Sequence, residues 1–113
     1  MRWFLRSKIH KATVTEAHVD YVGSITIDEA LLEECGMLPG EKVLVVDMTN
    51  GERLETYVIP GPRDSGQICM NGAAALRIKK GDHVIIMGFE LAEGPLEAQK
   101  ILVDENNRLV REL

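Results

Sequence analysis

Hydrophobic and polar residues alternate along much of the chain, in short runs separated by turn residues. Residues 3–17 place β-branched side chains between polar ones, which predicts one strand, or two with a bend. The clearest pair of strands is EKVLVVDMT and RLETYVI, joined through Asn50-Gly51, a dipeptide typical of tight hairpins. The other predicted strands are QICM, HVIIMGFEL and a final hairpin in KILVDENNRLVREL.

A short helix interrupts this pattern at residues 28–36. Asp28 is a good N-cap, Ile27 and Leu32 occupy the two positions of a hydrophobic staple, and Gly36 is a natural stop. The run NGAAALRIKKGD predicts a tight turn and a second short helical segment. Six or seven short strands with little helix indicate a small all-β barrel or sandwich that forms one domain over residues 1–113.

The composition indicates which residues can form the core of this domain. The chain has 113 residues, of which 45% are hydrophobic and only 4% aromatic, so the core is expected to consist of Val, Ile, Leu, Ala and Met. A chain of this length buries a smaller share of its surface than a large protein does, which favours further burial by oligomerisation.

The net charge of −5, without a basic block, argues against a nucleic-acid partner. No apolar run is long enough for a signal peptide or a membrane span, so we expect a cytoplasmic protein. The cysteines and histidines show no metal-site spacing, and we therefore expect reduced, partly buried thiols and no metal. These residues are Cys35, Cys69, His10, His18 and His83.

Four motifs occur in order: KIH at 8–10, YVGS at 21–24, TNGERLETY at 49–57 and NGAAA at 71–75. Together they closely resemble the L-aspartate α-decarboxylase family, whose members are pyruvoyl-dependent and make β-alanine for pantothenate and coenzyme A. The resemblance covers most of the chain, from about residue 5 to residue 90. It implies a small double-psi β-barrel with one or two short helices, assembled as a homotetramer with active sites between neighbouring subunits.

The resemblance also implies that the chain cuts its own Gly23–Ser24 bond into fragments 1–23 and 24–113. Ser24 attacks the Gly23 carbonyl, and later elimination and loss of ammonia convert Ser24 to a pyruvoyl group, which replaces pyridoxal phosphate as the electron sink. Glycine leaves its carbonyl open to attack, and serine supplies the only hydroxyl nearby. Taken alone, Gly-Ser is equally an ordinary turn before a strand.

Two neighbouring residues receive different roles from the resemblance. Thr56 hydrogen-bonds the Gly23 carbonyl during cleavage, and Tyr57 returns a proton to the substrate α-carbon after carbon dioxide leaves. Successive strand residues point to opposite faces, so serving one site requires a strand end, a bend or a subunit interface. Without the resemblance, Thr-Tyr is an ordinary strand dipeptide.

Arg53 and Lys8 are expected to bind the substrate carboxylates, because L-aspartate has two and only one leaves as carbon dioxide. Their ordinary alternative is solvated surface charge. The resemblance places backbone donors and small side chains at the site, with Asn71 supporting the oxyanion, and sets His10 and Tyr21 near the cleavage point. His10 fits a structural role equally well. The small-residue run consists of Asn71, Gly72, Ala73, Ala74 and Ala75.

Asp64 and Leu76 depart from the pattern of the resembled family. Leu76 follows the alanine run and alters the expected pocket shape, which leaves another acidic amino acid such as glutamate open as the substrate. A different class of function also stays open, in which an unprocessed barrel acts as a non-catalytic binding module. The sequence does not decide whether cleavage is spontaneous or assisted by a maturation protein.

Overall fold

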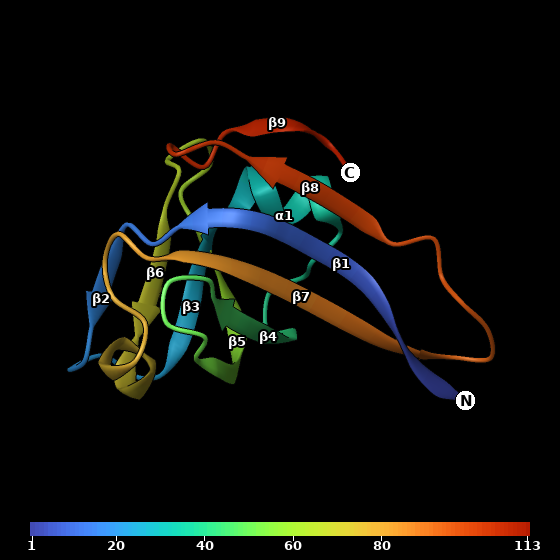
Figure 1. Cartoon of the computed structure of the whole chain (residues 1–113), viewed down its shortest axis with the longest axis horizontal. Helices are drawn as coiled ribbons and strands as arrows, with labels where there is room; N and C mark the ends of the chain where they lie inside the picture. Colours follow the sequence, from blue (N-terminus) through green and yellow to red (C-terminus); the bar gives the residue numbers. More distant parts are fainter.

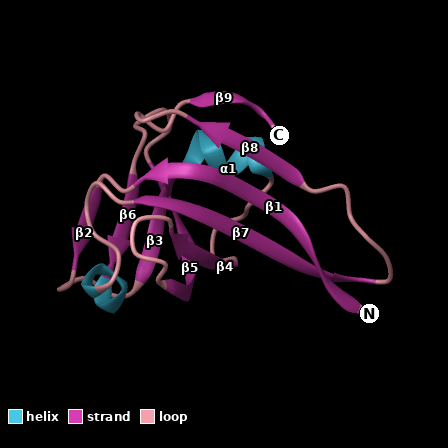
Figure 2. Cartoon of the chain, in the orientation of Figure 1, coloured by secondary structure: helices cyan, strands magenta, loops and turns pink.

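A computed structural model describes residues 1–113 as one mixed sheet of nine strands with one short α-helix and one 3-10 helix (Figures 1 and 2). The spatial order of the strands is β2-β6-β3-β5-β4-β7-β1-β8-β9. The strands are β1 Arg2–Thr13, β2 Glu16–His18, β3 Ser24–Asp28, β4 Lys42–Asp47, β5 Arg53–Gly61, β6 Ile68–Asn71, β7 His83–Ala92, β8 Gln99–Val103 and β9 Leu109–Glu112. The helices are α1 Glu29–Cys35 and η1 Gly72–Leu76.

The predicted all-β class is confirmed, and the arrangement is consistent with the expected small barrel. Strands β4 and β5 pair antiparallel, and the final hairpin forms between β8 and β9. The first hairpin turns at Asn50-Gly51 as predicted, because the Asp47 backbone N–H donates to the Glu52 carbonyl across that dipeptide at 2.8 Å, although β4 itself ends at Asp47. The Asp47 carboxylate accepts a hydrogen bond from the Thr49 backbone at 2.7 Å, and the Asp47 carbonyl accepts one from the Gly51 backbone at 2.9 Å, so Asp47 holds both parts of the loop.

Hydrophobic side chains from nearly every strand and from α1 form one core cluster. Its fully buried members are mainly isoleucine and valine, as the composition predicted, and they include Ile9, Ile25, Val58 and Ile86. No helix in the chain is long and apolar enough to cross a membrane. The core holds β3 in the interior of the sheet, between β5 and β6.

Asp28 fixes the end of β3 and the start of α1. Its carboxylate accepts hydrogen bonds from the backbone N–H groups of Ala30, Asp64 and Gly66, each at 2.9 Å. The helix ends at Gly36, whose φ of 73° is a left-handed conformation that glycine adopts without strain. These contacts confirm the predicted cap and stop. They also fix the position of β3, whose other end begins with Ser24.

Candidate active site

Ser24 is the first residue of β3 and is buried, with 1% of its surface exposed. The residues before it, Tyr21, Val22 and Gly23, are exposed and lie outside the sheet. The Gly23–Ser24 bond therefore lies at the boundary between an irregular segment and a fixed strand. An internal acyl shift needs a hydroxyl held beside the carbonyl that it attacks, and here that carbonyl belongs to the exposed Gly23.

Asn71 holds the Ser24 hydroxyl. The two residues are opposite each other in the antiparallel pairing of β3 with β6. The Asn71 Nδ2 group donates to Ser24 Oγ at 2.8 Å and to Thr26 Oγ1 at 3.0 Å. The Cys69 thiol donates to Asn71 Oδ1 at 3.2 Å, which completes the partners of the amide. Because the amide is buried and its two ends have different partners, its orientation is fixed.

Gly72 supports the backbone of the segment before Ser24. Its φ is 76°, and a Cβ atom built on it would lie 2.7 Å from Gly23 Cα and 2.9 Å from the Tyr21 carbonyl oxygen. Only glycine permits so close an approach. Together, Asn71 and Gly72 contact the two residues of the bond that is expected to break.

Strand β5 runs parallel to β3, with Val58 opposite Ile25. Continuing this register by one residue sets Tyr57 beside Ser24, and continuing it by two sets Thr56 level with Gly23. Tyr57 is 41% exposed and shares the face of Ser24, whereas Thr56 is half-buried and faces the other way. No bulge interrupts the pairing of β5 with β4, so the two side chains stay on opposite faces.

Arg53 is exposed on the same face of β5 as Tyr57 but four residues away, which is about 13 Å along an extended strand. Lys8 is half-buried on β1, and neither cation forms an ion pair within the chain. Strand β1 is separated from β3 by β7, β4 and β5. Along β5 and across the strand order of the sheet, respectively, Arg53 and Lys8 thus lie apart from Ser24.

His10 also lies on β1, beside a bulge at Lys11, whose φ is 65°. Its Nδ1 atom is buried without a hydrogen-bond partner. Burial lowers the pKa of His10, and the charges of Lys8 and Lys11 lower it further. The ring is therefore kept neutral at physiological pH.

The small residues of η1 face different surroundings. Ala73 is exposed, Ala74 is half-buried and Ala75 packs in the core. Leu76 is 61% exposed. Tyr21 is 59% exposed, and its ring packs against His18 at a centroid distance of 4.6 Å. The side chains of Ala73, Leu76 and Tyr21, next to the cleavage segment, are thus exposed to solvent in the single chain.

Comparison with known proteins decides the family. The aspartate decarboxylase family model matches residues 1–110. Aspartate 1-decarboxylase of Caldicellulosiruptor saccharolyticus is 57% identical over 111 residues, which cover 95% of this chain and 87% of that relative. The enzyme of the same name from Neisseria meningitidis is 53% identical, covering 96% of this chain and 88% of the relative. The corresponding Bacillus subtilis enzyme is 58% identical, covering 80% and 71%.

The chain belongs to the aspartate decarboxylase family.

Membership makes the chain an enzyme and confirms the predicted resemblance. Of the residues expected at the site, the fold of one chain brings together Gly23, Ser24, Asn71 and Gly72, and its strand register sets Tyr57 and Thr56 alongside. Arg53, Lys8 and His10 stay on other parts of the sheet. A hollow of about 560 Å³ is lined by Trp3, Lys42 and Phe89 among others, and not by Ser24.

Two contacts of Asn71 were missed from the sequence, namely Thr26 and Cys69. The signal was present, because both lie two residues from a motif residue and so share its face of the strand. Burial raises the pKa of Cys69, and the negative charge of Glu16 raises it further. The thiol therefore keeps the proton that it donates to Asn71. Cys35 is separate and in the core, where burial raises its pKa to about 11.

The contact between Gly72 and Gly23 leads to a prediction for this family member. A Gly72→Ala chain is expected to fold but to cut itself more slowly, since the new methyl group forces the backbone at 21–23 to shift. The positive φ adds a cost of roughly 1–2 kcal/mol. The measurement is a denaturing gel followed over time, with circular dichroism as the check on folding.

Gly94→Ala is the matched control, because a Cβ atom at Gly94 meets nothing within 4 Å. It should cut at the unmodified rate. Equal cutting of the Gly72→Ala and Gly94→Ala chains would show that the close approach of Gly72 does not position the bond.

Proposed function

We propose that this protein is a pyruvoyl-dependent decarboxylase that converts L-aspartate to β-alanine and carbon dioxide after cutting its own Gly23–Ser24 bond. The observation that carries the proposal is the buried Ser24 hydroxyl, held by Asn71 at the start of β3, with Gly72 against Gly23. The names of the relatives, all aspartate 1-decarboxylases, support the substrate. The product supplies pantothenate and coenzyme A synthesis.

Maturation uses only groups of this chain and one water molecule. Ser24 Oγ bonds to the Gly23 carbonyl carbon as its proton moves to the amide nitrogen, and the C–N bond breaks to leave an ester. Loss of the Ser24 α-proton then expels the Gly23 carboxylate. Water replaces the nitrogen, which leaves as ammonia, and the new N-terminus is a ketone. Asn71 Nδ2, which donates to Ser24 Oγ, is one donor for the developing negative charge. The Thr56 hydroxyl, which faces away from Ser24 on β5, is the second donor, and it acts on the Gly23 carbonyl beyond the end of the β3–β5 pairing.

The residues around Ser24 fit the pyruvoyl group. The Ser24 position is buried, Gly72 adds no side chain beside it, and the Asn71 amide is a donor there. When present, the group supplies a ketone that reacts with the substrate amine and takes up the electrons released by decarboxylation. Tyr57 lies on the same face as Ser24 and delivers a proton to the substrate α-carbon.

The substrate carboxylates are bound by Arg53 and Lys8. Because Arg53 lies about 13 Å from the level of Ser24 along β5, and Lys8 on a separated strand, a neighbouring subunit supplies them to each site. The homotetramer implied by the family resemblance provides such a neighbour, and its contact would cover the exposed side chains of Ala73, Leu76 and Tyr21. His10, on the same strand as Lys8, approaches the site in the same way.

The side chains of Ala73 and Leu76 then line the substrate entrance, while Ala74 and Ala75 contribute backbone. Leu76 is exposed in the single chain, so its side chain is free to limit the length of the substrate. A panel of L-aspartate, L-glutamate and uncharged amino acids, measured by carbon dioxide release, tests the substrate. Faster release from L-glutamate than from L-aspartate would overturn the assignment, and release from neither would support the binding-module alternative. Adding a cell extract tests for a maturation protein.

Arg53→Ala is expected to lower kcat/KM for L-aspartate by roughly 10–100-fold, the range for losing hydrogen bonds to a charged group. Self-cleavage should be unchanged, because Arg53 acts only on the substrate. The measurement is steady-state carbon dioxide release after a gel has shown complete cutting.

The control is Arg63→Ala, which removes an exposed arginine paired with Glu33 at the other end of β5. Surface pairs of this kind contribute about 0–1 kcal/mol, so its kcat/KM should match the unmodified enzyme. Equal values for Arg53→Ala and Arg63→Ala would remove Arg53 from the site.

A further inference from the structure

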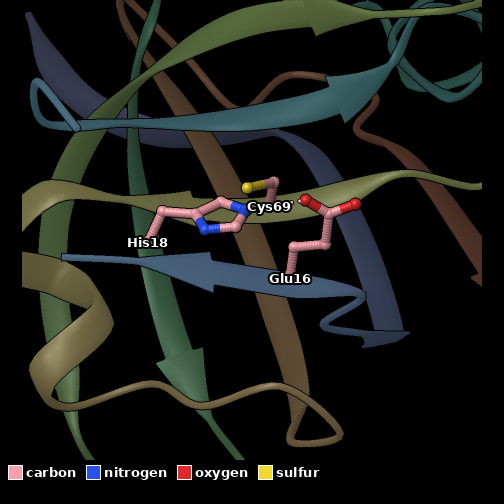
Figure 3. Close-up of side chains that lie close together, drawn as sticks. All are labelled: Glu16, His18 and Cys69. Carbon is pink, nitrogen blue, oxygen red and sulfur yellow. Dashed lines mark hydrogen bonds and ion pairs between the residues drawn. The ribbon is translucent and has the colours of Figure 1, made fainter. Parts of the chain in front are cut away.

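Three side chains with metal-binding atoms gather beside the cleavage site. A carboxylate oxygen of Glu16, an imidazole nitrogen of His18 and Cys69 Sγ all lie within 4.8 Å of one another (Figure 3). They come from β2 and β6, and the figure shows the imidazole and the carboxylate turned toward the sulfur. Neither Glu16 nor His18 has a role in the proposed reaction, and Cys69 enters it only as the donor that holds the Asn71 amide.

The strand register explains why they meet. Glu16 and His18 are two residues apart on β2 and so share a face. Strand β2 runs parallel to β6 with Glu16 opposite Cys69 and His18 opposite Asn71. The cluster and the Ser24–Asn71 hydrogen bond therefore lie on one continuous face of β2, β6 and β3. No spacing rule for metal sites detects this set, because Cys69 is distant in sequence.

The donor set is typical of zinc. Imidazole nitrogen, thiolate sulfur and carboxylate oxygen are the three protein ligands of Zn²⁺, with bonds of about 2.0–2.3 Å. Ligand atoms around one tetrahedral ion lie about 3.3–3.7 Å apart, so a small rotation of these side chains suffices. The site has access to solvent, since the side chains of His18 and Glu16 are 38% and 50% exposed.

We propose that Glu16, His18 and Cys69 bind one Zn²⁺ ion, with a water molecule in the fourth position. On binding, the thiol proton of Cys69 goes to solvent and the hydrogen bond of 2.7 Å between His18 and Glu16 is replaced by two bonds to the metal. The oxidation states of metal and sulfur do not change.

Zinc at this site weakens the hold of Asn71 on the Ser24 hydroxyl. The effect of this change on maturation rests on the proposed self-cleavage. The Cys69 thiol donates to Asn71 Oδ1, and the same amide donates to Ser24 Oγ. A zinc-bound thiolate has no proton to donate, so the Cys69 sulfur and Asn71 Oδ1 repel each other. The Asn71 amide then rotates away, and its hydrogen bond to Ser24 Oγ is lost. Loss of that one hydrogen bond slows self-cleavage by roughly 2–10-fold. The cluster is therefore an inhibitory site for maturation.

Binding is tested on the Ser24→Ala chain, which does not cut. Titration with Co²⁺, a spectroscopic substitute for Zn²⁺, should produce a thiolate-to-cobalt absorption band that saturates at one ion per chain and disappears when Zn²⁺ is added. Changing Cys69 to Ser should abolish the band. His18→Ala should weaken binding by more than the roughly 10–100-fold that loss of an outer partner costs.

Cys35→Ala is the matched control and should keep the band. Absence of the band in the Ser24→Ala chain, or its loss with Cys35→Ala but not with Cys69→Ser, would overturn the metal site. The His18→Ala result guards against a folding defect in the cysteine variant, because His18 lies on the exposed edge strand β2.

The effect on maturation is tested with newly translated wild-type chain, divided between Zn²⁺ and a chelator. Cutting should be slower with Zn²⁺, and the difference should vanish in His18→Ala. Equal rates in wild-type chain that binds the metal would overturn the inhibitory role. A chain that never cuts, even with the chelator, would contradict the proposed function instead and would leave the Co²⁺ result intact.

Discussion

A Ser24→Ala chain is expected to remain whole and to release no carbon dioxide from L-aspartate. The substitution removes the Ser24 hydroxyl, which is the attacking group in the proposed cleavage and the source of the ketone. The methyl group of alanine fits the buried position, so the fold should be retained. The loss is complete rather than partial, because no other hydroxyl is held beside the Gly23 carbonyl by a fixed donor. A denaturing gel and a carbon dioxide assay measure both effects.

Ser65→Ala is the matched control. Ser65 is exposed in the loop after β5, and its hydroxyl donates to the Pro62 carbonyl and accepts from the Gln67 backbone, both within that loop. This chain should cut and turn over L-aspartate like the unmodified enzyme. Cutting at residue 23 in the Ser24→Ala chain, or full activity without cutting, would contradict the proposed chemistry.

The second large effect is expected at Tyr57. A Tyr57→Phe chain should cut itself and carry the pyruvoyl group but decarboxylate L-aspartate about 10²–10⁴-fold more slowly, since a positioned general acid is worth that much. The strand register supports this role, because it sets Tyr57 beside Ser24 on the same face. Intact mass verifies the cut, and single-turnover carbon dioxide release measures the loss.

Thr56→Val is the paired variant. It keeps the side-chain shape but removes the hydroxyl assigned to the Gly23 carbonyl, a group that matters only before cleavage. This chain should remain mostly uncut. The two neighbours should therefore fail differently. An uncut Tyr57→Phe chain, or one with unmodified turnover, would show that the division of roles between them is wrong.

Local patterns predicted most of the fold. Alternating hydrophobic and polar residues predicted β4, β5 and β7 as strands. Asp28 and Gly36 predicted the two ends of the helix correctly, because capping depends on neighbouring residues alone. The Asn-Gly pattern located the first hairpin turn, whereas the end of β4 at Asp47 was not predicted, because it depends on the contact of the Asp47 carboxylate with Thr49.

The site was only partly predictable. The motifs identified Ser24 and Asn71, but their contact depends on the pairing of β3 with β6, which no local pattern specifies. The same pairing rules brought Cys69 to Asn71 and to the zinc ligands. Arg53 and Lys8 lie on other parts of the sheet, and their proposed delivery to the site by a neighbouring subunit depends on contacts between chains that local sequence patterns do not specify.

The central claim is that the Gly23–Ser24 bond breaks and leaves a ketone. An intact-mass spectrum of the purified protein under denaturing conditions tests it directly. The expected result is two species, residues 1–23 and residues 24–113, with the larger one lighter by one ammonia than simple hydrolysis would leave it. Full-length protein that persists after long incubation, with and without cell extract, would contradict the account, as would a larger fragment with an ordinary serine N-terminus.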